Sequence, residues 1–108
     1  MSGFENAAGF DWDDGNRRKN AHKHGVSQAE AEQVFLNEPL LLLEDVRHSQ
    51  QEPRFHALGQ TDAGKLLHIT FTLRGGGRLV RVISARLMSR REREVYDKKN
   101  KEDSVICF

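Results

Sequence analysis

Residues 53–87, PRFHALGQTDAGKLLHITFTLRGGGRLVRVISARL, decide the fold of this chain of 108 residues. Three stretches alternate between apolar and polar residues: Pro53–Gln60, Lys65–Leu73 and Arg78–Leu87. Such alternation is typical of strands that bury one face. The sequence TDAG at 61–64 and the three glycines at 75–77 predict turns between them. Because connections this short favour antiparallel neighbours, the segment predicts a meander.

Further elements are predicted on both sides of this meander. Leu40–Glu44 is a short apolar strand, and Pro39 ends the helix before it. Two capping-box patterns, Ser27 with Glu30 and Ser89 with Glu92, predict helix starts. A first helix is predicted from about Gly15 to His24, after a cap at Asp13 or Asp14, and a last one from Ser89 to about Asn100. We therefore predict an α+β domain with two N-terminal helices, a four-stranded antiparallel meander sheet and a C-terminal helix, all helices packing on one sheet face.

Length and composition predict a single globular domain. Hydrophobic residues make up 37% and charged residues 31% of the chain. We assign 1–9 to a disordered lead, 10–100 to the domain and 101–108 to a tail. There is no apolar run of roughly 20 residues that would span a membrane and no pattern of a secretion signal. The lone Cys107 has no partner for an internal disulfide, so we expect a cytoplasmic protein.

The alternation also predicts which side chains share each sheet face. One face is apolar, and the other carries these residues: Arg54, His56, His68, Thr70, Thr72 and Arg81. On the last strand, strict alternation puts Ser84 on the apolar face with Val80 and Val82, and Ala85 on the polar one. Arg81 and Arg86 have opposite parity, so they share a face only if the strand twists or bulges between them.

Charge is unevenly distributed although the net charge is only +1. The segment from Arg78 to Lys101 carries nine basic residues against Glu92, Glu94 and Asp97. A phosphate-binding surface would have this character. The alternative is a solvated helix face that an acidic face elsewhere compensates.

Three segments of the chain carry distinctive motifs. The first contains Phe10-Asp-Trp-Asp, Asn20 and Lys23-His24-Gly25-Val26. The second contains Leu43-Glu44-Asp45, Arg47-His48-Ser49 and Arg54-Phe55. The third contains Arg81-Val82-Ile83-Ser84-Ala85-Arg86 and Ser89-Arg90-Arg91-Glu92-Arg93. In this order and spacing, the three segments resemble the BrnT family of toxins. The match spans most of the chain from Phe10 to Asp97, although the lead and the lysine-rich tail differ from the family pattern.

The resemblance implies a RelE-like fold and a toxin of a type II toxin–antitoxin system that cleaves RNA and inhibits translation. It also implies a DNA-binding antitoxin, expected to be a ribbon-helix-helix protein, through which alone the toxin would reach operator DNA. A toxin homodimer within that complex is compatible with the resemblance. The other reading of the chain is a nucleic-acid-binding or regulatory module that keeps the fold without the catalysis.

RNA cleavage without a metal uses the 2′-hydroxyl of the substrate as nucleophile, and it needs proton transfer and stabilisation of charge on the phosphorane. Histidine and arginine suit these two tasks. The residues that we expect to be catalytic are His24, Arg54, Arg81 and Arg86. Those that we expect to bind RNA are Asn20, Lys23, Arg90 and Arg91.

Each of these residues also has a structural interpretation. His24 would be favoured as a cation at the end of a helix, Arg54 would form a surface ion pair with Glu52, and the arginines after Ser89 would line a solvated helix face. No cofactor is expected. The histidines lack the spacing of a metal site, so a metal-dependent hydrolase is the least favoured hypothesis.

Overall fold

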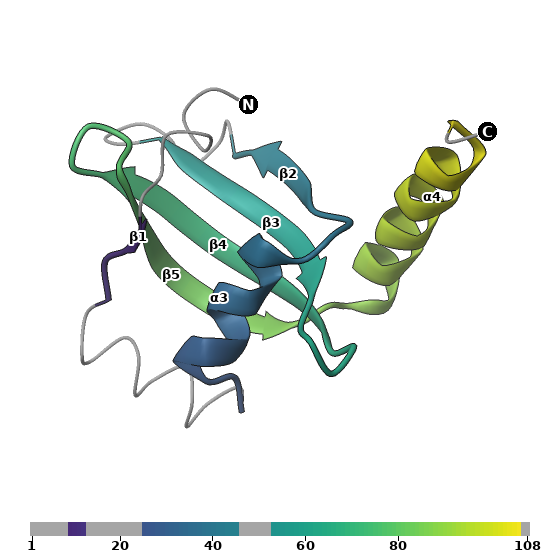
Figure 1. Cartoon of the computed structure of the whole chain (residues 1–108), viewed down its shortest axis with the longest axis horizontal. Coiled ribbons are helices and arrows are strands. Elements are labelled where there is room, and N and C mark those ends of the chain that lie inside the picture. Colours follow the sequence, from purple (N-terminus) through teal and green to yellow (C-terminus); the bar gives the residue numbers. More distant parts are fainter. Residues whose placement is uncertain (1–8, 13–24, 46–52, 107–108) are drawn as a thin grey trace.

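A twisted five-stranded sheet organises the computed structural model of this chain, which describes residues 9–12, 25–45 and 53–106 (Figure 1). The strands are β1 (Gly9–Phe10), β2 (Leu41–Glu44), β3 (Arg54–Gln60), β4 (Leu66–Arg74) and β5 (Leu79–Leu87), and the helices are α3 (Gln28–Leu36) and α4 (Arg90–Ile106). The strand order across the sheet is β1-β5-β4-β3-β2. None of the helices described is long and apolar enough to cross a membrane.

The α+β class and the meander of four strands are confirmed, but the sheet is mixed and not purely antiparallel. Strands β2 to β5 pair with their chain neighbours in antiparallel fashion. Strand β1, which the sequence did not predict, pairs in parallel with β5, with Gly9 opposite Leu79 and Phe10 opposite Val80. Its two residues are too few to show any alternation. The first helix predicted from Gly15 to His24 lies outside the described residues.

Helix α3 covers the apolar face of the sheet. Its predicted capping box forms: the Glu30 amide donates to the Ser27 hydroxyl at 3.1 Å, and the Ser27 amide donates to the Glu30 carboxylate at 3.0 Å. Val34 and Phe35 point into the core, where Phe35 packs edge-on against Phe71 with ring centroids 5.1 Å apart. The apolar stripe of the helix therefore meets the apolar face of the sheet, as the sequence predicted.

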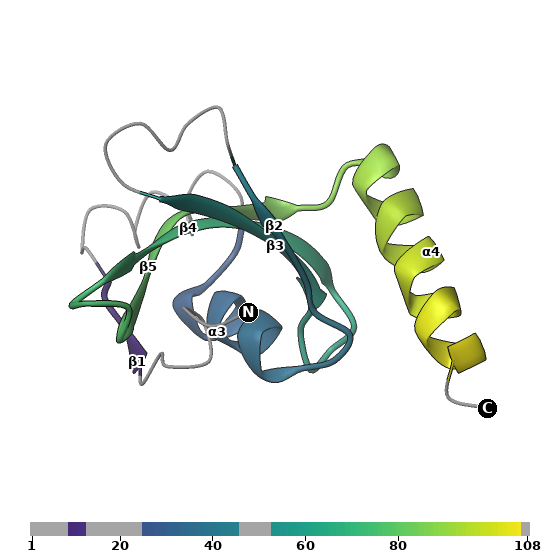
Figure 2. The same ribbon diagram turned by 90° about the horizontal axis from the view of Figure 1, so that it is seen from above.

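Helix α4 packs against the opposite face of the sheet, so the prediction that all helices cover one face is wrong. Tyr96 and Met88 form a second buried cluster with Leu58, which points away from α3. The Tyr96 hydroxyl donates to the Pro39 carbonyl at 2.6 Å. Viewed from above, α3 lies below the sheet and α4 stands beyond its end (Figure 2). Helix α4 also continues past Asn100, where the sequence predicted its end.

A bulge in β5 changes which side chains of this strand face the core. Thr70 of β4 pairs with Ser84, but the next residue, Phe71, pairs with Val82, so Ile83 is the extra residue. Val82 and Ala85 are therefore both buried in the core. The strict alternation that placed Ser84 on the apolar face and Ala85 on the polar face is wrong, because the bulge inverts parity beyond Ile83.

We predict that Gly59→Ala destabilises the fold where α3 crosses β3. A Cβ atom at this position would lie 2.8 Å from Val34 Cγ1 and 3.3 Å from the Val34 carbonyl oxygen. Overpacking of this kind costs about 1–3 kcal/mol of the free energy of unfolding, measurable by urea denaturation. Gly9→Ala is the matched control, since its Cβ would meet only Leu79 at an ordinary 3.7 Å. Equal stability of the two variants would contradict this packing.

Candidate functional site

The face of the sheet opposite α3 carries mostly polar side chains, in three rows that run across β3, β4 and β5. The first row is Arg54, Thr72 and Arg81, the second is His56, Thr70 and Ser84, and the third is Leu58, His68 and Arg86. The outer rows are four residues apart along β4, so they lie about 13 Å apart. We call these nine positions the polar face. Because of the bulge in β5, Arg81 and Arg86 both belong to it.

Two histidines, one in the second row and one in the third, are in contact on the polar face. Their rings stack with centroids 4.9 Å apart and planes inclined by 22°. The His56 Nδ1 atom lies 3.0 Å from His68 Nε2 and 3.1 Å from the Thr70 hydroxyl, and its Nε2 atom lies 2.9 Å from a carboxylate oxygen of Asp45. A continuous hydrogen-bonded chain therefore runs from Asp45 through His56 to His68.

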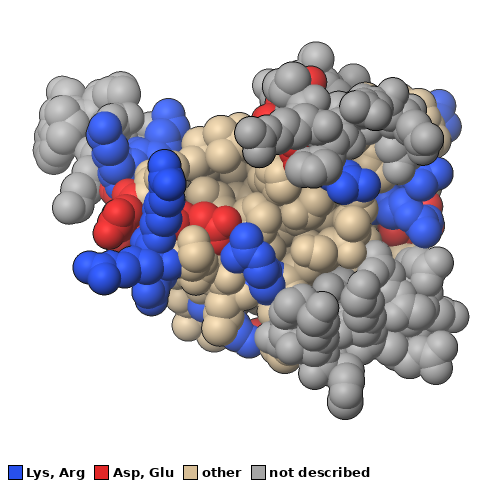
Figure 3. Space-filling view, turned by 180° about the vertical axis from the view of Figure 1, so that it is seen from behind, with Lys and Arg blue, Asp and Glu red and all other residues tan. Residues whose placement is uncertain are grey.

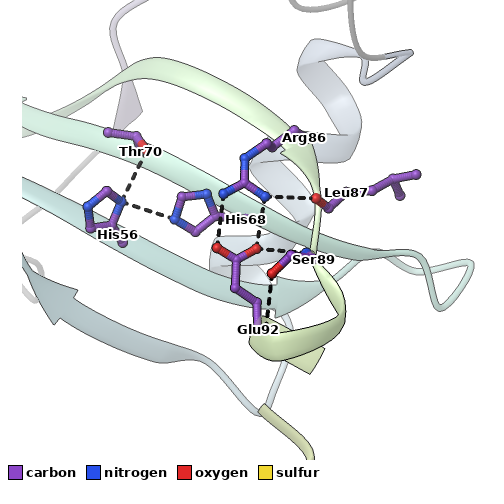
Figure 4. Close-up of polar contacts among 7 residues, drawn as sticks. All are labelled: His56, His68, Thr70, Arg86, Leu87, Ser89 and Glu92. Carbon is purple, nitrogen blue, oxygen red and sulfur yellow. Dashed lines mark hydrogen bonds and ion pairs between the residues drawn. The ribbon is translucent and has the colours of Figure 1, made fainter. Parts of the chain in front are cut away.

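Arg86 closes one side of the histidine pair and is held there by Glu92 (Figure 4). The two terminal guanidinium nitrogens of Arg86 lie 2.8 and 2.9 Å from the two Glu92 carboxylate oxygens. Glu92 also accepts a hydrogen bond from the Ser89 amide at 2.8 Å and completes the capping box that starts α4. The contact with Arg86 lowers the pKa of Glu92 to about 2. One carboxylate thus fixes both the helix start and the arginine.

A cavity of about 420 Å³ opens beside this group. The residues that line it come from β2, β3, β4, the end of β5 and α4: Leu43, His56, Leu58, His68, Arg86, Ser89, Arg91, Glu92 and Val95. Seen from this side, Lys and Arg side chains gather over α4, next to the largely uncharged surface of the sheet (Figure 3). The cavity therefore combines apolar walls, a histidine floor and a cationic rim.

Burial keeps His68 neutral. Its side chain is 8% exposed, and the loss of hydration lowers the pKa of His68 to about 4, with Glu92 opposing and Arg86 reinforcing the shift. An imidazole in this state can accept a proton but carries no charge at neutral pH. Of the described residues, no group of three or more His, Cys, Asp or Glu side chains is placed to hold a metal ion.

Comparison with known proteins assigns the chain to a family. Residues 12–92 match the family model described as the ribonuclease toxin BrnT of type II toxin–antitoxin systems. The chain belongs to the BrnT family. Among solved structures it is similar to the 1.1 Å crystal structure of the Brucella abortus ribonuclease toxin BrnT, with a TM-score of 0.58 and 22% identity over 78% of this chain and 100% of that chain. That likeness shows the fold alone. No curated protein matches the chain.

The structure brings together some of the residues that the sequence predicted for the site. Arg54, Arg81 and Arg86 share the polar face of this BrnT-family chain, and Arg91 reaches the cavity. Arg90 does not line the cavity. Its side chain is 89% exposed and lies 3.7 Å from the Glu94 carboxylate. The remaining candidates, Asn20, Lys23 and His24, lie outside the described residues, as does Glu52.

Sequence reasoning did not nominate three side chains that shape this site. His56 and His68 were placed on the polar face, but their contact depends on the register of β3 against β4. Glu92 was recognised as a capping residue, and nothing in the local pattern pairs it with Arg86. The signal that could have found the histidines is the rarity of histidine in mid-strand.

We predict that burial of neutral His68 makes stability depend on pH between about 6.5 and 4. The pKa of His68 is lowered on folding, so the unfolded chain takes up the proton first, and the stabilisation is complete above pH 6.5 and is lost as pH falls toward 4. Between about pH 7 and about pH 4.5 this group should account for about 2–3 kcal/mol of the free energy of unfolding.

The measurement is urea denaturation of the wild type and His68→Gln at both pH values. The variant should lose less stability on acidification than the wild type, because glutamine does not titrate. An identical pH dependence in both proteins would show that His68 is not held neutral.

Proposed function

We propose that this chain is a metal-independent endoribonuclease that cleaves RNA by attack of the substrate's own 2′-hydroxyl and thereby inhibits translation in the cytoplasm. Membership of a family of ribonuclease toxins supports RNA as the substrate. The observation that carries the mechanism is the gathering of Arg54, Arg81 and Arg86 on one sheet face beside a pair of histidines. Cations and imidazoles are the groups that this reaction needs.

The arginines would bind the phosphodiester and stabilise the charge that the phosphorane gains. A guanidinium can hold two phosphate oxygens at once, and Arg86 already presents two nitrogens to the Glu92 carboxylate. Arg54 and Arg81, about 13 Å away along the sheet, would contact a neighbouring part of the RNA backbone. Arg91 at the cavity rim, with Lys23, Asn20 and Arg90, would add contacts outside the reacting phosphate. His24 remains a candidate for one of the two proton transfers.

Family membership also supports an antitoxin partner. We propose that it is a DNA-binding protein of the ribbon-helix-helix class, that the toxin reaches operator DNA only through it, and that the toxin pairs as a homodimer within that complex. Co-purification of the chain with the product of the neighbouring reading frame tests the pairing. Light scattering gives the stoichiometry, and a complex without DNA affinity would contradict the proposed class of antitoxin.

We expect the purified chain to cleave single-stranded RNA in the presence of EDTA and to leave 2′,3′-cyclic phosphate and 5′-hydroxyl ends, as mass spectrometry of the products would show. An oligonucleotide with 2′-O-methyl groups should resist cleavage because the nucleophile is blocked. Arg86→Ala should lower the cleavage rate by about 10²–10³-fold if Arg86 stabilises the phosphorane. Arg54→Ala and Arg81→Ala, which remove contacts about 13 Å away along the sheet, should mainly weaken RNA binding. These variants should also relieve growth arrest on expression.

Arg78→Ala provides the control, since this arginine is exposed in the hairpin between β4 and β5 and is absent from the polar face. It should cleave like the wild type. RNA binding without cleavage by the wild type would instead favour the non-catalytic module. Cleavage that EDTA abolishes would contradict the metal-independent mechanism.

A further inference from the structure

The hydrogen bonds of the histidine pair determine where its protons lie. The Asp45 carboxylate can only accept, so the His56 Nε2 atom, 2.9 Å away, carries a proton. In a neutral imidazole the other nitrogen is then an acceptor. His56 Nδ1 therefore accepts from His68 Nε2 at 3.0 Å and from the Thr70 hydroxyl. Each imidazole therefore donates its proton in the direction of Asp45.

This arrangement of protons leaves the Nδ1 atom of His68 unprotonated, with its lone pair available to accept a hydrogen bond. Since Nε2 of His68 donates to His56, Nδ1 carries no proton. It is buried and has no hydrogen-bond partner among the residues that the structure describes. A buried acceptor without a partner is destabilising, so its presence calls for a physical reason. Figure 4 shows His68 between His56 on one side and the Arg86–Glu92 pair on the other.

We propose that His68 Nδ1 is the general base that removes the proton from the attacking 2′-hydroxyl, an assignment that rests on the RNA cleavage proposed above. The attacking oxygen belongs to the ribose that carries the reacting phosphate. The base must therefore lie next to the cation that holds this phosphate. His68 meets that condition, because it lines the same cavity as Arg86 and Glu92.

Entry of the substrate explains how a buried nitrogen becomes accessible. A phosphodiester that binds the two terminal nitrogens of Arg86 competes with the Glu92 carboxylate for the same positions. Exchange of these partners opens the side of the imidazole that faces Arg86. Catalytic contacts of this kind commonly tighten only in the substrate complex.

Transfer of a second proton from His68 to His56 explains how a weakly basic imidazole can serve as the general base. As the bond from O2′ to phosphorus forms, the hydroxyl proton passes to His68 Nδ1 and the Nε2 proton of His68 passes to His56 Nδ1. The positive charge then rests on His56, 2.9 Å from the Asp45 carboxylate and in a side chain that is 28% exposed. The bond from phosphorus to O5′ breaks, and the leaving oxygen takes a proton from water. His68 is the catalytic residue, and His56 and Asp45 are positioning residues.

His68→Gln tests the assignment directly. The glutamine amide nitrogen can replace Nε2 as the donor to His56, but the variant has no basic nitrogen at the position of Nδ1. We expect the single-turnover cleavage rate of an RNA oligonucleotide to fall by about 10²–10⁴-fold. Affinity for the same oligonucleotide with 2′-O-methyl groups, measured by fluorescence anisotropy, should not change. Imidazole should restore part of the rate in His68→Ala.

Thr70→Val is the matched control, because it removes the other hydrogen bond to the same nitrogen of His56. Its rate should fall by less than about tenfold. If neither His68 variant folds, Asp45→Asn offers a second route. An asparagine amide that donates to His56 Nε2 reverses the direction of the hydrogen bonds, so that His56 Nδ1 donates to His68 Nε2 and the proton of His68 moves to Nδ1. Cleavage should then fall, and ¹⁵N NMR should show the other tautomer of His68.

Wild-type cleavage that His68→Gln retains would overturn the assignment of the base and leave the proposed ribonuclease standing. The same holds if His68→Gln lowers RNA binding and cleavage in parallel, since that pattern indicates a structural role. A wild-type chain that binds RNA without cleaving it would overturn both proposals.

Discussion

The one-residue bulge at Ile83 is the constraint on which the rest of the polar face depends. Without it, a strand that buries Val82 would point Arg86 into the core, where an unpaired guanidinium could not be tolerated. With it, Val82 and Ala85 are both buried in the core, while Arg81 and Arg86 lie together on the opposite face. The bulge therefore reconciles a continuous apolar core with a cationic surface on a single strand.

The sequence pattern correctly predicted the elements that depend on interactions between residues close together in the chain. The capping boxes at Ser27 and Ser89 and the turns at 61–64 and 75–77 are set by side chains within a few residues, and they appear where the sequence placed them. The bulge is different, because it is defined by the register of β5 against β4. The parallel pairing of β1 with β5 joins segments about seventy residues apart and leaves no periodic signal.

The site shows the same division between local and non-local information. Alternation placed His56 and His68 on the correct face, but only the register of β3 against β4, which brings His56 opposite Thr70, puts their rings in contact. Glu92 has one role that the sequence pattern predicts and one contact that it does not. Its role at the start of α4 is readable from the spacing to Ser89, whereas its pairing with Arg86 depends on how the chain turns between β5 and α4.

The carboxylates that accompany the arginines shape what the polar face can bind. Arg86 faces Glu92, and Arg81 lies 3.4 Å from Asp11. An incoming phosphodiester with a single negative charge replaces a carboxylate of equal charge, so the exchange yields little net attraction. The phosphorane of the proposed reaction carries one more negative charge than the phosphodiester. The same guanidinium therefore attracts the phosphorane more strongly than it attracts the bound substrate. Carboxylate partners thus suppress binding of the substrate relative to its transition state, and only such a difference accelerates the chemical step.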